Sequence, residues 1–119
     1  MSRSPHELIR HILDEIEYLQ TQTAAMDYDA FLKDSTAKRA IVRSLEIIGE
    51  ASKKLPEDVK SLQPDIEWRK VTGMRDRLIH DYFGVDYAIV WDAITTRIPD
   101  LHSKMLALLE AVGKPLSGN

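Results

Sequence analysis

Helical periodicity is the feature that most constrains how this chain can fold. Apolar side chains recur at spacings of three and four residues through almost the whole sequence, and no segment alternates with a period of two for long. The first such stripe consists of Leu8, Ile9, Ile12, Leu13, Ile16 and Leu19. The segment Ser4-Pro5-His6-Glu7 precedes it and matches a capping box with proline at the first helical position. We therefore expect the first helix to begin there and to run to about Thr23.

Capping residues and prolines divide the rest of the chain into further helices. The predicted segments are a short turn over Asp27–Lys33, a long helix capped by Asp34 or Ser35, a short helix that begins at Pro56 and cannot pass Pro64, a helix from Trp68 to about Asp81, and a last helix capped by Asp86. Pro99 lies inside the last helix, and the apolar pattern resumes at Leu101, so we expect the proline to kink or interrupt this helix rather than end it. The sequence predicts an all-α fold, an up-and-down bundle of four to five main helices.

Composition excludes several classes of protein. The 119 residues suffice for one domain, so we expect a single helical domain over residues 1–119. The sequence contains no cysteine, which excludes disulfides, thiolate zinc sites, iron–sulfur clusters and a cysteine nucleophile. The net charge of −3 does not fit a protein that coats nucleic acid through overall positive charge. Apolar stretches are too short to span a bilayer and no signal peptide is visible, so we expect a cytoplasmic location.

Positive charge is concentrated in one segment. Residues 68–80 contain four cationic side chains and one aspartate, whereas residues 1–37 contain three cationic and seven acidic residues. A basic pole of this kind could bind a phosphate-bearing ligand. Charge alone, however, favours a solvated basic face of a helix over a binding site.

Arg75, Asp76 and His80 together suggest a chemistry for this segment. On a helix Asp76 and His80 are neighbours, and a carboxylate beside an imidazole can fix its tautomer and raise its pKa. Arg75 and His80 differ by about 140° around an ideal helix, so the helix must end near His80, or a second copy must complete the site. An arginine and a histidine suffice for metal-independent RNA cleavage, because histidine can transfer the proton while the guanidinium stabilises charge on phosphorus. We expect no metal and no other cofactor.

Three segments resemble a known family. They are IIGEASKKLP at 47–56, PDIEWRKVTGMRDRLIHDYFGVD at 64–86 and VWDAITTRIPDL at 90–101. The second contains Arg-x4-His-x-Tyr as Arg75, His80 and Tyr82. In order and spacing these segments resemble the HEPN superfamily, specifically its HepT-like branch of toxin ribonucleases. The likeness extends over most of the chain from about residue 39 onward.

This resemblance implies a HEPN-like helical bundle that dimerises through the motif region, with the motif helices lining a cleft between protomers. It implies that Arg75 and His80 are the catalytic residues of a metal-independent endoribonuclease. Asp76 occupies a position where asparagine is common in the family, and its role would be to support His80. The resemblance also implies a partner, a minimal nucleotidyltransferase antitoxin. In the family this antitoxin transfers AMP from ATP to the motif tyrosine, which corresponds to Tyr82.

Glu50 in the IIGEA segment corresponds to a glutamate typical of the family, and we expect a structural ion pair with the motif arginines rather than acid catalysis.

The predicted function is the RNA-cleaving toxin of a type VII toxin–antitoxin pair, acting as a homodimer. The alternative is a non-catalytic HEPN module that binds nucleotide or RNA, or that serves as an accessory subunit of a nucleotidyltransferase. Intact Arg75 and His80 favour the first function.

Overall fold

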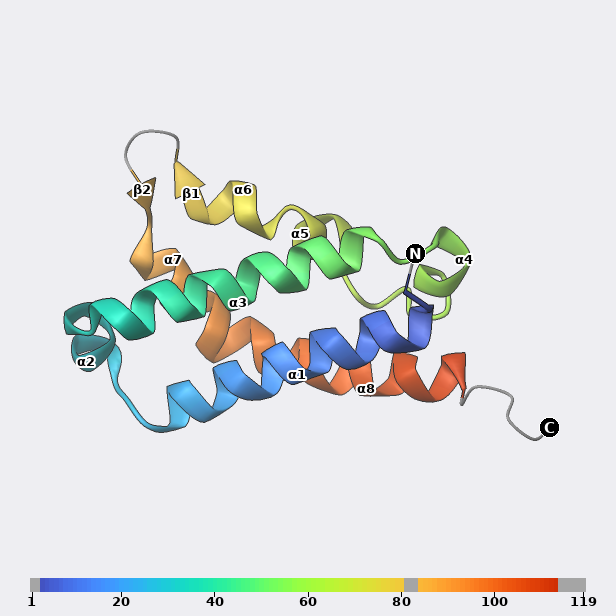
Figure 1. The fold of residues 1–119 in the computed structure, drawn as a ribbon, viewed down its shortest axis with the longest axis horizontal. Coiled ribbons are helices and arrows are strands. Elements are labelled where there is room, and N and C mark those ends of the chain that lie inside the picture. Colours follow the sequence, from blue (N-terminus) through green and yellow to red (C-terminus); the bar gives the residue numbers. More distant parts are fainter. Residues whose placement is uncertain (1–2, 81–83, 114–119) are drawn as a thin grey trace.

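The computed structural model describes residues 3–80 and 84–113, and for Ile79 and His80 it describes the backbone only. Three long helices form the body of the molecule (Figure 1): α1 (Pro5–Ala24), α3 (Ser35–Lys53) and α8 (Ile98–Val112). Helix α1 packs against both α3 and α8. The fully buried side chains at these contacts include Ile9, Ile12, Ile16, Leu19, Ile41, Leu45, Ile48, Ile98, Met105 and Leu108. Because these side chains follow the helical spacing of the sequence, the all-α prediction is confirmed.

The predicted caps of the first helices are confirmed. Ser4 Oγ accepts a hydrogen bond from the Glu7 backbone N–H, and Glu7 accepts one from the Ser4 N–H, at 3.1 and 3.0 Å. The short helix α2 (Tyr28–Lys33) starts after Asp27, and Asp34, one of the two expected candidates, caps α3. Each aspartate accepts a hydrogen bond from the backbone N–H three residues later, which satisfies a donor at a helix start.

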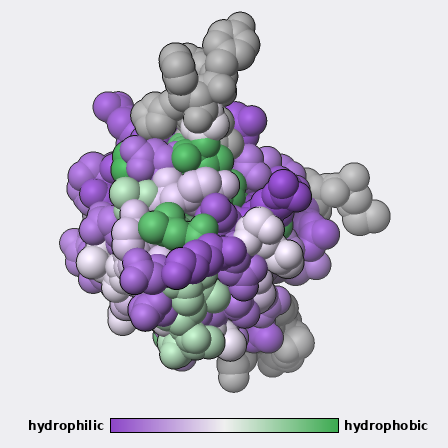
Figure 2. Space-filling view, turned by 90° about the vertical axis from the view of Figure 1, so that its left-hand side faces the viewer, coloured by the Kyte–Doolittle hydropathy of each residue, from purple (hydrophilic) through white to green (hydrophobic). Residues whose placement is uncertain are grey.

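Helix α2 closes one end of the bundle. Its Phe31 is fully buried, with its ring 5.2 Å from that of Trp91 and 6.0 Å from that of Tyr87. Tyr28 and Leu32 of the same helix remain partly exposed. Figure 2 shows the molecule from this end, and on the described part of that face hydrophobic areas alternate with hydrophilic side chains. The described residues there do not form one continuous apolar surface.

The helix predicted from Trp68 to about Asp81 is shorter than expected and interrupted. After the short α4 (Glu57–Lys60), the segment forms α5 (Trp68–Thr72) and α6 (Met74–Leu78), separated at Gly73. Two short strands then pair antiparallel, β1 (Ile79–His80) and β2 (Gly84–Val85). Glycine has low helix propensity, and the Gly73 N–H donates to Arg69 O as the closing bond of α5. Asp86 N–H donates to Leu78 O at 3.0 Å, which gives the last carbonyl of α6 a partner outside a helix.

The kink or interruption predicted at Pro99 takes the form of a π-helical turn. Helix α7 (Tyr87–Asp92) is capped by Asp86, as expected, and continues through η2 (Ala93–Arg97) into α8. Within this turn the Ile98 N–H donates to Ala93 O, five residues earlier. Pro99 has no N–H, so it cannot continue the α-helical ladder, and the wider turn accommodates the change. The apolar stripe of α7 and α8 therefore stays on the core side.

Among the helices of the described ranges, no candidate is long and apolar enough to cross a membrane.

Candidate functional site

Arg75 lies on α6 and reaches across to α3. Helices α5 and α6 pack along α3 (Figure 1), which places Arg75 beside Glu46. Arg75 Nε donates a hydrogen bond to Glu46 Oε2 at 3.0 Å. The Arg75 side chain is 57% exposed, whereas the Glu46 side chain is only 17% exposed. The guanidinium is therefore held at one nitrogen by a fairly buried carboxylate while most of the group faces solvent.

This contact belongs to a row of alternating charges, which we call the charged row: Glu50, Arg43, Glu46, Arg75 and Asp76. Arg43 Nη1 lies 3.8 Å from a carboxylate oxygen of both Glu46 and Glu50. Arg75 Nη1 lies 4.0 Å from Asp76 Oδ1. The structure thus gives Glu46 the pairing with Arg75 that the sequence assigned to Glu50. Both glutamates lie on one face of α3 one turn apart, and the start of α6 at Met74 places Arg75 opposite the earlier turn.

The expectation that Asp76 and His80 are neighbours on one helix is wrong, because α6 ends at Leu78 and the His80 backbone belongs to β1. Support of His80 by Asp76 stays a prediction, since the His80 side chain is not among the described residues. The Asp76 side chain is 88% exposed and contacts Arg75. The early end of α6 meets one of the two conditions under which Arg75 and His80 could act on one phosphate, because the chain leaves the helical path before His80.

A tight strand pair sets the backbone of His80. Its strand register pairs His80 with Gly84 and Ile79 with Val85. Gly84 has φ = 80°, a conformation that glycine adopts at no steric cost. Asp86 ties this pair to the following helix, because its carboxylate accepts hydrogen bonds from the N–H groups of Ala88 and Ile89. Tyr82 and the side chain of His80 lie outside the described residues.

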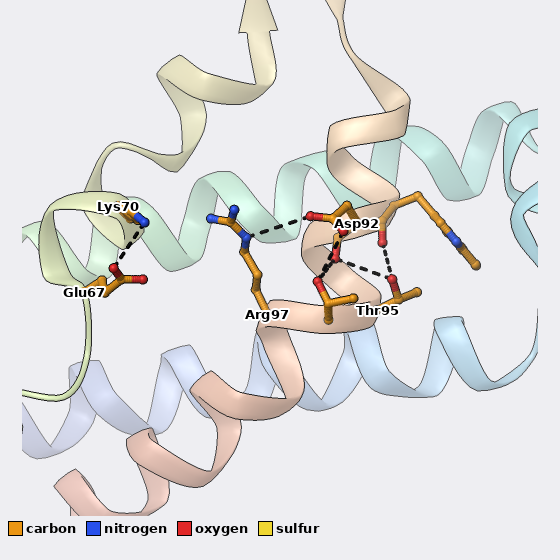
Figure 3. A network of polar contacts seen from close by, with 7 residues as sticks. Glu67, Lys70, Asp92, Thr95 and Arg97 are labelled. Atoms are coloured by element: carbon orange, nitrogen blue, oxygen red, sulfur yellow. Dashed lines mark hydrogen bonds and ion pairs between the residues drawn. The ribbon is translucent and has the colours of Figure 1, made fainter.

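A groove of about 440 Å³ lies on the other side of α6, between α5–α6 and η2–α8. Apolar side chains such as Met74, Leu78 and Ile89 line it, together with charged residues of both signs. Figure 3 shows two of its ion pairs, Lys70 with Glu67 at 3.1 Å and Arg97 with Asp92 at 3.9 Å. The same view shows threonine hydroxyls bonded back to the helix backbone, as in Thr95 Oγ1 to Trp91 O at 2.7 Å.

Lys104 closes the groove at the α8 side. Its ammonium lies 2.8 Å from Asp100 Oδ2, and this hydrogen bond raises the pKa of Lys104. The four lysine and arginine residues that line the groove are matched by four acidic residues. The basic segment predicted from the sequence is therefore divided in the fold. Arg75 faces α3, Arg77 and Lys70 line the groove, and carboxylates compensate most of the charge.

No group of three or more His, Asp or Glu side chains in the described ranges is arranged to hold a metal ion.

Glu46 is the residue of this region that sequence reasoning missed. Its signal was present, because Glu46 and Glu50 are four residues apart on the same helix. The periodicity cannot decide which of the two meets Arg75, since the choice depends on how α6 is placed along α3.

Comparisons with known proteins find a matching family and relatives over most of the chain. The family model described as "Ribonuclease HepT-like" matches residues 12–108, a range that includes Arg75 and His80. A protein of Caldanaerobacter subterraneus subsp. tengcongensis named as a putative RNase is 42% identical over 108 residues, which cover 91% of this chain and 96% of that protein. A protein of Thermococcus cleftensis named as a probable ribonuclease HepT is 43% identical over 104 residues, 87% of this chain and 94% of that one.

A third relative, from Methanocaldococcus jannaschii and named in the same way as the first, is 40% identical over 95 residues, 80% of this chain and 75% of its own. The search of solved structures found no match. The family match covers most of the chain and confirms the resemblance found in the sequence. The chain belongs to the HepT-like ribonuclease family of the HEPN superfamily.

Proposed function

We propose that this protein is a metal-independent endoribonuclease in which Arg75 and His80 carry out the cleavage. The observation that carries the proposal is the family match over residues 12–108, which spans both residues. The exposed guanidinium of Arg75 supports it, because a phosphate can reach the nitrogens that Glu46 does not bind. The early end of α6 supports it too, since it takes the His80 backbone off the helix that carries Arg75.

The proposed reaction is a transesterification within the RNA. The 2′-hydroxyl loses its proton and its oxygen attacks the adjacent phosphorus, while the bond from phosphorus to the leaving 5′-oxygen breaks and that oxygen gains a proton. His80 transfers protons in this scheme. Arg75 stabilises the additional negative charge on the five-coordinate phosphorus, because its planar fork matches the phosphate oxygens. The products are a 2′,3′-cyclic phosphate and a free 5′-hydroxyl.

We propose that the active form is a homodimer with the motif regions facing a shared cleft. Two copies would place two Arg75–His80 sets across one groove. Asp76, which is highly exposed and near Arg75, would lie at the edge of this cleft. Its negative charge would then limit how closely phosphates approach. Because its carboxylate lies 4.0 Å from Arg75 Nη1, Asp76 would act on Arg75 more directly than on His80.

We also propose regulation as a toxin–antitoxin pair. The partner is a minimal nucleotidyltransferase that uses ATP. The phenol oxygen of Tyr82 would attack the α-phosphorus of ATP, lose its proton and displace pyrophosphate, leaving AMP bound to the tyrosine. The attached phosphate, two residues from His80 in sequence, would compete with RNA for Arg75.

The first experiment is cleavage of total RNA by unmodified protein in EDTA. We expect cleavage by the wild type and its loss in Arg75→Ala and in His80→Ala. Arg77→Ala is a matched control, because Arg77 is exposed on the same short helix but lines the groove between α6 and α8, away from α3. His102→Ala is the control for the imidazole. Cleavage that survives both motif substitutions, or cleavage that EDTA abolishes, would contradict the proposed mechanism.

The second experiment tests the regulation. The protein is incubated with ATP and its proposed partner, a minimal nucleotidyltransferase, and intact mass is then measured. We expect a mass increase equal to AMP that disappears in Tyr82→Phe but persists in Tyr18→Phe, since Tyr18 is a partly exposed tyrosine on α1. Absence of AMP transfer from an active nucleotidyltransferase would contradict the toxin–antitoxin proposal.

In the cleavage experiment, a folded dimer that binds RNA without cutting it would instead support the alternative function, a non-catalytic module that binds RNA.

A further inference from the structure

We infer that Glu46 is a positioning residue that holds the Arg75 guanidinium in the orientation needed for the proposed reaction. The inference rests on the proposed ribonuclease function and adds a residue that neither the sequence motif nor the family match assigns to it. Three features of the structure carry it: the nitrogen through which Arg75 is bound, the burial of Glu46, and the second cation on the same carboxylate.

The contact uses Nε, the nitrogen nearest the aliphatic part of the arginine side chain. Glu46 Oε2 accepts this hydrogen bond at 3.0 Å. A guanidinium has five N–H donors in one plane, so a bond at Nε fixes that plane and leaves other donors for a phosphate. A carboxylate bound to the two terminal nitrogens would instead occupy the fork that recognises phosphate.

Glu46 is also the better-anchored partner of the pair. Its side chain is 17% exposed against 57% for Arg75. Its other oxygen, Oε1, lies 3.8 Å from Arg43 Nη1. Each carboxylate oxygen therefore has its own cation, one from the same helix and one from α6. A side chain held on both sides can impose its orientation on the more exposed Arg75.

Positioning and simple charge predict opposite effects on the reaction. A carboxylate near a phosphate site repels RNA, so its removal on charge grounds alone should tighten RNA binding and lower KM. If Glu46 orients Arg75, its removal should lower kcat, because the guanidinium must then be ordered during the reaction. The two effects therefore separate in the steady-state constants.

Glu50 provides a matched control. It lies one turn further along α3 and carries the same charge, with a side chain 56% exposed. In the described part of the chain its ion pair is with Arg43, at 3.8 Å, and not with Arg75. Substituting Glu50 therefore removes a similar charge from the charged row without removing the contact at Nε.

The test is the measurement of kcat and KM on a defined RNA for Glu46→Ala, Glu46→Gln and Glu50→Ala, with melting temperature as the check of folding. We expect Glu46→Ala to lower kcat about tenfold, within the ~10²-fold that a misplacement of 1 Å can cause, without raising KM. Glu46→Gln should fall between Glu46→Ala and the wild type, because its amide oxygen can still accept from Nε. It also preserves the side-chain shape if Glu46→Ala is poorly folded. Glu50→Ala should leave kcat within about twofold of the wild type.

A double-mutant comparison sharpens the result. Lysine at position 75 has no guanidinium plane to orient, so Glu46→Ala should lower kcat much less in an Arg75→Lys background than in the wild type. Equal effects in both backgrounds, or equal effects of the two glutamate substitutions on kcat, would overturn the inference while leaving the ribonuclease proposal intact. An inactive wild type would contradict the ribonuclease proposal itself, and this inference with it.

Discussion

Gly49 sets the distance between α3 and the segment that carries Arg75, and the effect of its substitution on stability depends on two opposing contributions. A methyl group added at this position would lie 3.2 Å from Val71 O and 3.5 Å from Thr72 O. The first distance is shorter than an ordinary contact, and the neighbouring atom is backbone, which cannot rotate away. Helix α5 would therefore have to shift by a few tenths of an ångström.

Gly49→Ala gains helix propensity and loses packing. Alanine is favoured over glycine in a helix interior by about 1 kcal/mol. Added volume in a tightly packed contact costs typically about 1–3 kcal/mol. Because the obstructing atoms belong to the backbone of α5, we expect the packing cost to outweigh the gain in propensity and the free energy of unfolding to fall by about 1 kcal/mol. The same shift would also disturb the 3.0 Å contact between Glu46 and Arg75.

The assay is equilibrium unfolding in urea, followed by far-UV circular dichroism, with RNA cleavage measured on the same samples. We expect a lower urea midpoint for Gly49→Ala, a still lower one for the bulkier Gly49→Val, and reduced kcat in Gly49→Ala under conditions where it is fully folded. An increase in the free energy of unfolding by about 1 kcal/mol, the full propensity gain, would refute the close approach of α3 and α5.

The remaining predictions concern stability. Ser4→Ala should lower the free energy of unfolding by about 1 kcal/mol through loss of the cap of α1, which thermal unfolding would reveal as a lower melting temperature. The pKa of Glu7 is lowered from 4.5, chiefly by its hydrogen bond from the Ser4 backbone, so its stabilising effect is present above that pH and is lost as the pH falls through the folded-state pKa. Glu7→Gln should accordingly reduce the loss of stability between neutral pH and acid, and an unchanged pH dependence would contradict this. Ser52 is fully buried and its hydroxyl lacks a hydrogen-bond partner among the described residues, so Ser52→Ala should leave the urea midpoint unchanged or raise it, and a marked decrease would count against the unpaired hydroxyl.

Local signals in the sequence were sufficient for the long helices. The capping box at Ser4, the caps at Asp34 and Asp86 and the kink at Pro99 depend on residues close together in the chain, and all four are confirmed. Apolar spacing likewise identified the buried faces of α1 and α8. These features needed no knowledge of how one helix lies against another.

The motif segment was harder to predict because its conformation depends on distant contacts. Apolar and charged residues continue through residues 68–81 with helical spacing, so nothing local required the helix to stop at Leu78. The end of α6 is stabilised by the pairing of β1 with β2 and by the bond from Asp86 to Leu78. The choice of Glu46 over Glu50 as partner of Arg75 likewise depends on the placement of α6 along α3.

Glycine positions illustrate the same limit. Gly49 allows a close approach between helices, which requires knowing what faces it, and α5 supplies that neighbour. Gly73 marks the break between α5 and α6, and a methyl group there would meet only the carbonyl of Arg69 within 4 Å among the described atoms. Sequence alone shows two glycines in helical surroundings, and it does not reveal which one packs against a neighbour and which one ends a helix.

The central claim is that the RNA's own 2′-hydroxyl is the nucleophile at a site formed by Arg75 and His80. The most direct measurement uses an RNA oligonucleotide with a mapped cleavage position and a copy with a single deoxyribose immediately 5′ of the cut phosphate. We expect the protein, in EDTA, to cut the first to a 2′,3′-cyclic phosphate and to leave the second intact at that position. Cleavage of the deoxyribose copy at the same phosphate, or a product that carries a 5′-phosphate, would contradict the claim.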